Sequence, residues 1–250
     1  MGGVTLIPVE GLPEVTVAFN IGKSIAEQVP LEDGDIIAVS QKIVSKSEDR
    51  VVRLDETEPG PEAISLASRT GKDPRLVQHI LNESQNLIRV DEARGILITE
   101  TNHGFICANA GIDQSNTATE DEAILLPLDP DGSARRIRVE LETASSKRNA
   151  VLITDSFGRA WRQGQVEVAI GCAGIKPLDD WRGRRDQRGR ELTATVIGLA
   201  DQLAAASDLV RGKTDGVPAV ILRGLGDFVT EDDGPGCAVQ LRDPEDDLFR

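Results

Sequence analysis

Six short aliphatic runs, each bounded by turn residues, constrain the fold of this chain more than any other feature. Runs of this length and composition are typical of β-strands. The predicted strands lie at residues 35–40, 95–99, 104–109, 150–154, 166–171 and 218–224. Helical patterns lie between them without a strict alternation of strand and helix. The sequence therefore predicts an α+β fold rather than a doubly wound sheet.

Three segments show helical spacing of apolar residues. Residues 73–85 begin with Asp73 as a predicted N-cap, followed directly by a proline, a pair typical of helix starts. Residues 131–142 predict a helix with Ser133 as its cap, and residues 191–210 predict a third helix. The third is rich in small residues, so we expect it to pack closely against a neighbour.

The chain contains no internal repeat and no low-complexity linker. Its 250 residues and 39% hydrophobic content, mostly aliphatic, predict a globular protein with a sizeable core. We expect one domain over residues 1–250, with a softer boundary between two lobes near residues 144–149. The acidic C-terminal tail, which is punctuated by proline and glycine, is expected to form loops.

The net charge of −14 argues against a nucleic-acid partner, because phosphate backbones require clustered lysine and arginine. No apolar run is long enough for a bilayer-spanning helix, and the N-terminus lacks the pattern of a secretory signal. We therefore expect a cytoplasmic protein without a membrane partner.

Few soft metal ligands are present. The three cysteines are far apart in the sequence and are interpreted as small buried residues, and only two histidines occur. A bound metal is therefore expected to be a hard cation held by oxygen atoms.

The segment "WRGRRDQRGR", residues 181–190, is a basic exception in an acidic chain. Guanidinium groups fit phosphate and carboxylate oxygens, so this segment is a candidate for binding a small polyanion. A solvated loop that pairs with surface acids explains the segment equally well.

Two aspartates stand at predicted strand ends. Asp155, followed by Ser156 in "ITDSFGR", can offer oxygen ligands to Mg²⁺ or Mn²⁺, but an Asx-turn is an equally good explanation. Asp113 in "CANAGIDQSN" is open to the same two interpretations. The chain has no Walker A loop and no Rossmann fingerprint, so a bound nucleotide would be held without either.

Several long segments carry a family resemblance: "LIPVEGLPEV", "DGDIIAVSQKIVSKSEDR", "NHGFICANAGIDQSN", "LLPLDPDGSARRIR", "VLITDSFGRAWRQGQVEVAIGCAGIKPLDDWRGRRDQRGRELTATV" and "GVPAVILRG". In order and spacing they resemble the coenzyme F-420-0:L-glutamate ligase family. The resemblance implies that family's own α+β fold, with two lobes and a mixed sheet, and a homodimer. It also implies a GTP-dependent ligase of coenzyme F-420 biosynthesis.

Such an enzyme activates the carboxylate of coenzyme F-420-0 as an acyl phosphate, forms an amide with L-glutamate, and adds further glutamates by gamma-linkage. The implied cofactors are Mg²⁺ or Mn²⁺ at two sites, with K⁺ as an additional cation and GTP as co-substrate. An alternative from another class is a non-catalytic module that binds a nucleotide or F-420.

The resemblance also implies roles for individual residues. Asp113 and Asp155 would be the catalytic ligands of one metal ion, and Ser156 a ligand of the second. Either Asp215 or water would complete that second shell. Nucleotide contacts are implied for Leu12, Pro13, Glu14, Val15, Gln41, Lys42, Lys46, Asn116, Arg211, Gly212, Lys213, Thr214, Asp215, Gly216 and Val217. From local charge alone, Arg182, Arg184, Arg185 and Arg188 are predicted to bind the anionic acceptor or glutamate.

Overall fold

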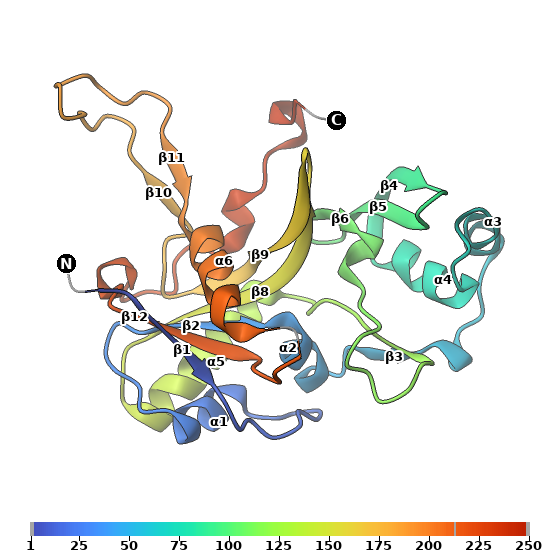
Figure 1. Ribbon diagram of the computed structural model, residues 1–250, viewed down its shortest axis with the longest axis horizontal. Helices are drawn as coiled ribbons and strands as arrows, with labels where there is room; N and C mark the ends of the chain where they lie inside the picture. The colour runs from blue at the N-terminus through green and yellow to red at the C-terminus, as the bar shows by residue number, and fades with distance from the viewer. Residues whose placement is uncertain (1–2, 213, 249–250) are drawn as a thin grey trace.

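The computed structural model describes residues 3–212 and 214–248 and shows a mixed α+β fold (Figure 1). A five-stranded sheet forms its centre. In spatial order its strands are β1 (Thr5–Val9), β12 (Ala219–Arg223), β2 (Ile36–Ser40), β8 (Ala150–Arg159) and β9 (Arg162–Ala173). Only β2 and β8 pair in parallel, while the other neighbours are antiparallel.

The central strands are buried on both faces, which explains their unbroken aliphatic sequences. In β2, Ile37 and Val39 belong to the core cluster on one face, and Ile36 and Ala38 belong to the cluster on the other. Successive side chains of a strand point to opposite faces, so a strand covered on both sides needs apolar residues at every position.

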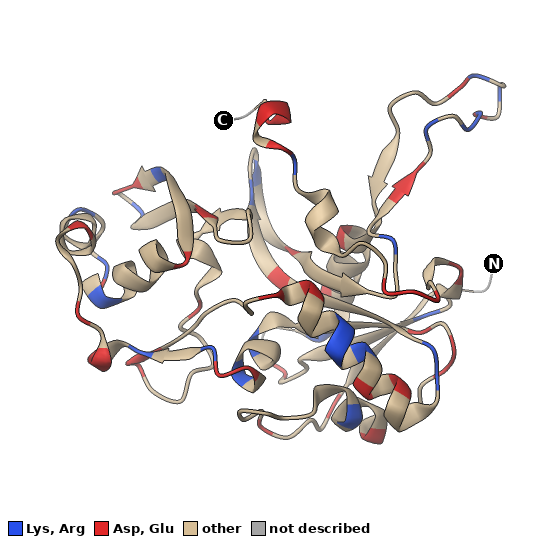
Figure 2. Cartoon of the chain, turned by 180° about the vertical axis from the view of Figure 1, so that it is seen from behind, with Lys and Arg blue, Asp and Glu red and all other residues tan. Residues whose placement is uncertain are grey.

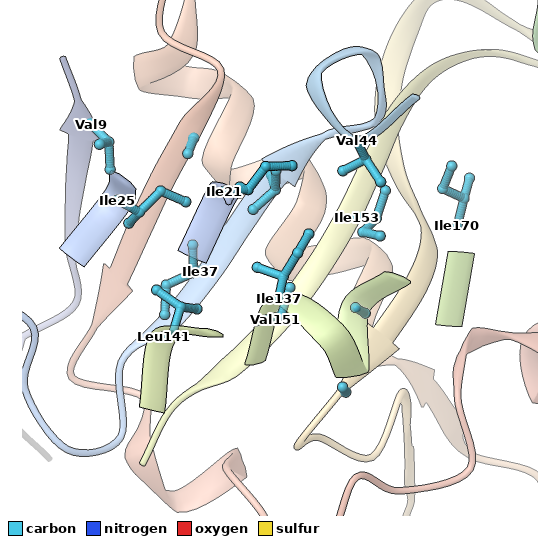
Figure 3. Close-up of a cluster of buried hydrophobic side chains, with 14 of the residues drawn as sticks. Val9, Ile21, Ile25, Ile37, Val44, Ile137, Leu141, Val151, Ile153 and Ile170 are labelled. Atoms are coloured by element: carbon cyan, nitrogen blue, oxygen red, sulfur yellow. The ribbon is translucent and has the colours of Figure 1, made fainter. Parts of the chain in front are cut away.

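Helices cover both faces of the sheet. On one face, α1 (Ile21–Gln28) and α5 (Pro130–Ser145) contribute Ile21, Ile25, Ile137 and Leu141 to the core, as Figure 3 shows. On the other face, α6 (Leu199–Arg211) contributes leucine and alanine side chains. The small residues of α6 allow the close packing that the sequence predicted.

A second lobe lies beside the sheet and has its own core (Figure 1). It is built between residues 51 and 124. Its elements are β3 (Val51–Arg53), α3 (Pro61–Thr70), α4 (Pro74–Asn82), β4 (Ser84–Asp91), β5 (Ile96–Thr101), β6 (Ile106–Ala108) and β7 (Glu122–Ile124). Strands β4, β5 and β6 form a three-stranded sheet, and β3 pairs with β7.

Three short elements complete the fold. Helix α2 (Gln41–Ser47) follows β2 directly and adds Val44 to the core cluster of α1 and α5. Strands β10 (Leu178–Asp180) and β11 (Val196–Gly198) pair at the base of an arm that projects away from the rest of the chain in Figure 1.

The helix starts agree with the predictions in one case and differ in two. Asp73 caps α4 by accepting from the Arg75 backbone N–H at 2.8 Å, as predicted. The cap of α5 is Asp129 rather than Ser133, because Pro130 already occupies the first helical position. The helix predicted from residue 191 begins only at Leu199, because the preceding residues form β11.

Residues 144–149, predicted as a softer boundary between lobes, join α5 to β8. Both elements pack into the same core cluster. The chain instead passes from one hydrophobic core to the other at the two ends of the second lobe, near residues 50 and 125. Among the described residues, no helix combines the length and apolarity needed to span a membrane.

Candidate functional site

A cavity of about 1290 Å³ opens between the central sheet and the second lobe. The sheet contributes the ends of β2 and β8, followed on the β2 side by α2. The second lobe contributes β6 and the loop that leads from it to β7. In open α/β sheets, ligands bind beyond the carboxyl ends of parallel strands, and β2 and β8 are the parallel pair here.

Asp155 and Ser156 reach this cavity because β8 is longer than β2. The parallel pairing ends at Ser40 with Thr154, and the next residues of β8 extend past the point where α2 begins. A register shift between β8 and β9 falls directly after Ile153. Such bulges bend a strand and redirect its side chains.

Asp155 is partly buried in the cavity wall. Burial, together with the nearby carboxylates of Glu167 and Asp113, raises the pKa of Asp155 to about 7. A cation placed among these oxygen atoms would offset their repulsion.

Asp113 comes from the opposite wall, where its backbone forms an isolated bridge with Ile124 of β7. Its Oδ2 lies 2.7 Å from Lys42 Nζ, and its Oδ1 accepts from the Ser115 backbone N–H at 2.6 Å. Burial favours the neutral acid, but the hydrogen bonds from Lys42 and Ser115 outweigh it, so the pKa of Asp113 lies below its ordinary value. Asp113 is therefore held as a carboxylate.

Two lysines of α2 line the cavity one helical turn apart. Lys42 Nζ pairs with Asp113 and also donates to Ser115 Oγ at 2.6 Å. Lys46 Nζ lies 2.6 Å from Glu14 Oε1, in the segment 12–15 that was predicted to contact a nucleotide. Residues four apart on a helix share one face, which brings both ammonium groups to the same side.

Glu167 of β9 is a cavity residue that the sequence analysis missed. Its Oε1 accepts a hydrogen bond from Ser156 Oγ, and its Oε2 accepts from Arg211 Nη1 at 2.9 Å. The same Arg211 Nη1 donates to Thr154 Oγ1 at 2.9 Å. A signal was present in the sequence, because Glu167 is the only acid in the aliphatic run 166–171.

The structure brings most of the predicted site residues together in the cavity wall. These are Leu12, Pro13, Glu14, Val15, Lys42, Lys46, Asp113, Asn116, Asp155, Ser156, Arg211, Gly212, Thr214, Gly216 and Val217. Arg211 differs from the rest, because its guanidinium is engaged in a buried ion pair with Glu167.

Other predicted residues are not part of this wall. The Gln41 side chain is buried and accepts from Ser45 Oγ at 2.9 Å. The Asp215 carboxylate accepts from Thr214 Oγ1 at 3.1 Å and folds back over Gly212. Lys213 lies outside the described residues.

The predicted substrate-binding residues Arg182, Arg184, Arg185 and Arg188 lie on the β10–β11 arm and do not line the cavity of their own chain. Figure 2 shows basic residues gathered along the outer part of the arm. Arg182 pairs with Asp180 at 2.6 Å, and Arg184 lies over the Trp181 ring at 4.7 Å from its centroid. Two of the arginines therefore already have partners within the arm.

The donor set of the cavity suits a hard divalent cation. Asp113 and Asp155 offer carboxylate oxygens and Ser156 a hydroxyl oxygen, which are the ligand types that Mg²⁺ and Mn²⁺ prefer. The lysines beside them can neutralise the phosphate groups of a nucleotide.

Comparison with known proteins identifies the family of the chain. The family model described as F420-0:Gamma-glutamyl ligase matches residues 11–224. A Coenzyme F420:L-glutamate ligase from Methanothermobacter thermautotrophicus is 47% identical over 254 residues, which covers 99% of each chain. Proteins of the same name from Methanopyrus kandleri and Methanocaldococcus jannaschii are 45% and 44% identical, covering 100% and 93% of this chain and 100% and 90% of their own. The chain therefore belongs to the F420-0:gamma-glutamyl ligase family.

Proposed function

We propose that this protein is a GTP-dependent ligase that joins L-glutamate to coenzyme F-420-0 and then adds further glutamates through gamma-linkages. Membership in the family supports the amide-forming reaction and the acceptor. The observation that carries the proposal is one cavity that combines two lysines, two aspartates and a serine from three separate parts of the chain. This combination suits phosphoryl transfer, which relies on positioning and charge neutralisation.

The proposed reaction has two steps. A carboxylate oxygen of the acceptor attacks the γ-phosphorus of GTP, and GDP leaves with the electrons of the broken P–O bond. The amine nitrogen of glutamate then attacks the carbon of the acyl phosphate. Inorganic phosphate leaves with the electrons of the broken C–O bond, and the nitrogen loses a proton to give the amide.

The residues of the cavity have separate tasks in this proposal. Lys42 and Lys46 would hold the phosphate oxygens, as a P-loop lysine does on other scaffolds. Asp113 and Asp155 would hold one divalent ion and Ser156 a second. When bound, these ions supply the positive charge that offsets the charge of the transferred phosphoryl group. The family resemblance also supports K⁺ as a further cation, a homodimer and a cytoplasmic location.

The size of the cavity supports two substrates rather than one. Pockets for a single small ligand usually enclose roughly 300–1,000 Å³, and this cavity is larger, at about 1290 Å³. A nucleotide and an acceptor carboxylate can therefore lie in it together. Holding both reactants in one site is what converts a bimolecular step into an intramolecular one.

The test is a product analysis. The purified protein is incubated with GTP, Mn²⁺, L-glutamate and F-420-0, and the products are identified by mass spectrometry. A mass increase of one or more glutamyl residues with release of GDP supports the proposal. Binding of GTP or F-420-0 without GDP release would instead support the non-catalytic module.

A further inference from the structure

Glu167 and Ser156 face each other across the β8–β9 hairpin in the cavity wall. They are direct partners in the antiparallel register, where neighbouring side chains on one face lie in contact. Ser156 Oγ donates a hydrogen bond to Glu167 Oε1, and Glu167 is only 4% exposed. The next residue before Ser156 is Asp155, so this contact lies directly beside the proposed metal ligands.

The direction of this hydrogen bond fixes the Ser156 hydroxyl. A serine hydroxyl has one proton to donate and two lone pairs that accept. Because an ionised carboxylate can only accept, the Ser156 proton points towards Glu167. Every further partner of Ser156 Oγ must therefore be a hydrogen-bond donor or a cation.

Arg211 keeps the other oxygen of Glu167 in place. Arg211 Nη1 donates to Glu167 Oε2 and to Thr154 Oγ1, each at 2.9 Å, and both partners are buried. Arg211 is the last residue of α6, directly before the cavity-lining segment that begins at Gly212. The ion pair and the hydrogen bond to Thr154 thus join the middle of β8, the middle of β9 and the end of α6.

A structural role alone explains this arrangement poorly. Taking a charged pair out of water costs free energy, and well-packed apolar residues of similar volume often hold a fold equally well. A β-hairpin next to an aliphatic core could therefore be held without Glu167 and Arg211. Their placement instead meets a requirement of the cavity, where Ser156 must present lone pairs rather than a proton.

We propose that Glu167 is a positioning residue that holds the Ser156 proton away from the cavity, so that Ser156 Oγ presents its lone pairs to a divalent cation. Arg211 acts through Glu167 by fixing the carboxylate. The inference rests on the metal site of the proposed function and adds a residue outside the predicted ligand set. Groups that orient metal ligands in this way typically change metal affinity about 10- to 100-fold when they are replaced.

The sharpest variant is Glu167→Gln. The Arg211 guanidinium needs an acceptor, so the amide oxygen of the new side chain turns towards Arg211 and its NH₂ group towards Ser156. The NH₂ group then donates to Ser156 Oγ, which reverses the original hydrogen bond. We expect the Kd for Mn²⁺, measured without nucleotide from the electron paramagnetic resonance signal of free Mn²⁺, to rise about tenfold or more.

Two further variants separate positioning from general effects. Glu122→Gln removes a carboxylate that lines the same cavity but whose side chain accepts from the Ala118 backbone N–H instead. It is expected to change the Kd for Mn²⁺ by less than about threefold, as a partly exposed charge would. Ser156→Ala removes the hydroxyl itself, and adding Glu167→Gln to it should cause no further loss of affinity.

The outcomes are distinct. A Glu167→Gln protein that binds Mn²⁺ as tightly as the wild type overturns the inference, as does an equal loss with and without the Ser156 hydroxyl. If Glu167→Gln does not fold, the double variant Glu167→Gln/Arg211→Gln leaves no unpaired buried charge. The new NH₂ group at position 211 replaces the guanidinium as donor to the amide oxygen at position 167, so the amide NH₂ still faces Ser156 and the same loss is expected. Wild-type protein that binds no Mn²⁺ overturns both this inference and the metal site. Mn²⁺ binding without glutamylation of F-420-0 overturns only the proposed reaction.

Discussion

At the scale of single residues, Lys42 lies between the carboxylate proposed to bind a metal ion and the lysine face proposed to bind phosphate. Its ammonium group contacts both the Asp113 carboxylate and the Ser115 hydroxyl, and it lies on the same helix face as Lys46. A cation that binds Asp113 must share this carboxylate with Lys42, whereas a phosphate group gains from the lysine. We therefore expect metal binding and nucleotide binding to respond to Lys42 in opposite directions.

Replacement of Lys42 by methionine tests this opposition. We expect the KM for GTP to rise about 10- to 100-fold, since a hydrogen bond to a charged group contributes about 1.5–3 kcal/mol. The Kd for Mn²⁺ without nucleotide should fall, because Asp113 loses its competing ammonium partner. Lys42→Arg, which retains the charge, is the matched control. Weaker Mn²⁺ binding by Lys42→Met would contradict this account of Asp113.

The Cys107 thiol in the cavity wall should be unreactive despite its position. Burial, and secondly the Asp155 carboxylate, raises the pKa of Cys107 to about 12. Only the thiolate reacts with alkylating agents. We expect negligible labelling of Cys107 by iodoacetamide at pH 8 in the native protein and rapid labelling after denaturation, as read by peptide mass mapping. Fast native labelling would show that this part of the wall opens to solvent.

At the scale of elements, helices α1 and α5 approach each other closely at Gly22 of α1. A Cβ atom there would lie 2.7 Å from the Ile137 carbonyl oxygen and 2.7 Å from the Leu141 backbone nitrogen, both in α5. The Gly22 backbone N–H also donates to Glu140 Oε2 at 2.9 Å. The absence of a side chain allows α1 to lie close to α5 over the core.

Gly22→Ala is therefore expected to destabilise the fold by about 1–3 kcal/mol, because the backbone of α5 cannot move aside cheaply. Urea denaturation followed by circular dichroism measures this loss. Gly158→Ala in β8 serves as the control, since a Cβ there would meet no described atom within 4 Å. Equal stability of the two variants would mean that α1 and α5 shift apart without cost.

The elements that the sequence predicted well are those whose local pattern and tertiary environment agree. The segment 35–40 was recognised as a strand because burial on both faces leaves no polar residue between Ile36 and Val39 of β2. Residues 191–198 were misassigned because helical spacing competed with β-branched residues that pair with β10. Short elements such as α2 carry too few residues for a clear period.

Only part of the candidate site was accessible to the same reasoning. Asp113 and Asp155 lie on different walls of the cavity, so nothing local in the sequence connects them, and the family resemblance alone placed them together. Glu167 was not recognised because its partners, Ser156 and Arg211, are distant in sequence and meet it only through the sheet register and the end of α6.

At the scale of the whole molecule, charge is distributed unevenly. The chain has a net charge of −14, yet residues 181–190 carry five arginines on an arm directed away from the cavity of its own chain. The predicted role of these arginines in binding an anionic substrate is therefore compatible with this structure only if the arm reaches the cavity of a second copy. The predicted homodimer would supply that copy.

Mixing two inactive variants tests this arrangement. Arg184→Ala/Arg185→Ala impairs the arm, and Asp113→Asn is expected to remove metal-dependent GTP turnover. If the arm acts on the second copy, a heterodimer of the two contains one complete site. Activity should therefore return on mixing after subunit exchange, to at most half of the wild-type value per dimer. An unimpaired arm variant, or no recovery with proven exchange, would exclude arginines that act across the dimer.

The exposed arm also offers a protease five closely spaced arginines. Trypsin cleaves after arginine, and residues 181–191 are exposed throughout, whereas Arg138 and Arg211 are buried. Brief digestion should therefore nick the arm first and leave two fragments held together by β9 and α6, which pack against each other on one face of the sheet. The rate of that first cut can be measured with and without added substrates and at low and high protein concentration. A slower cut would show that a substrate or a second copy of the chain shields the arm.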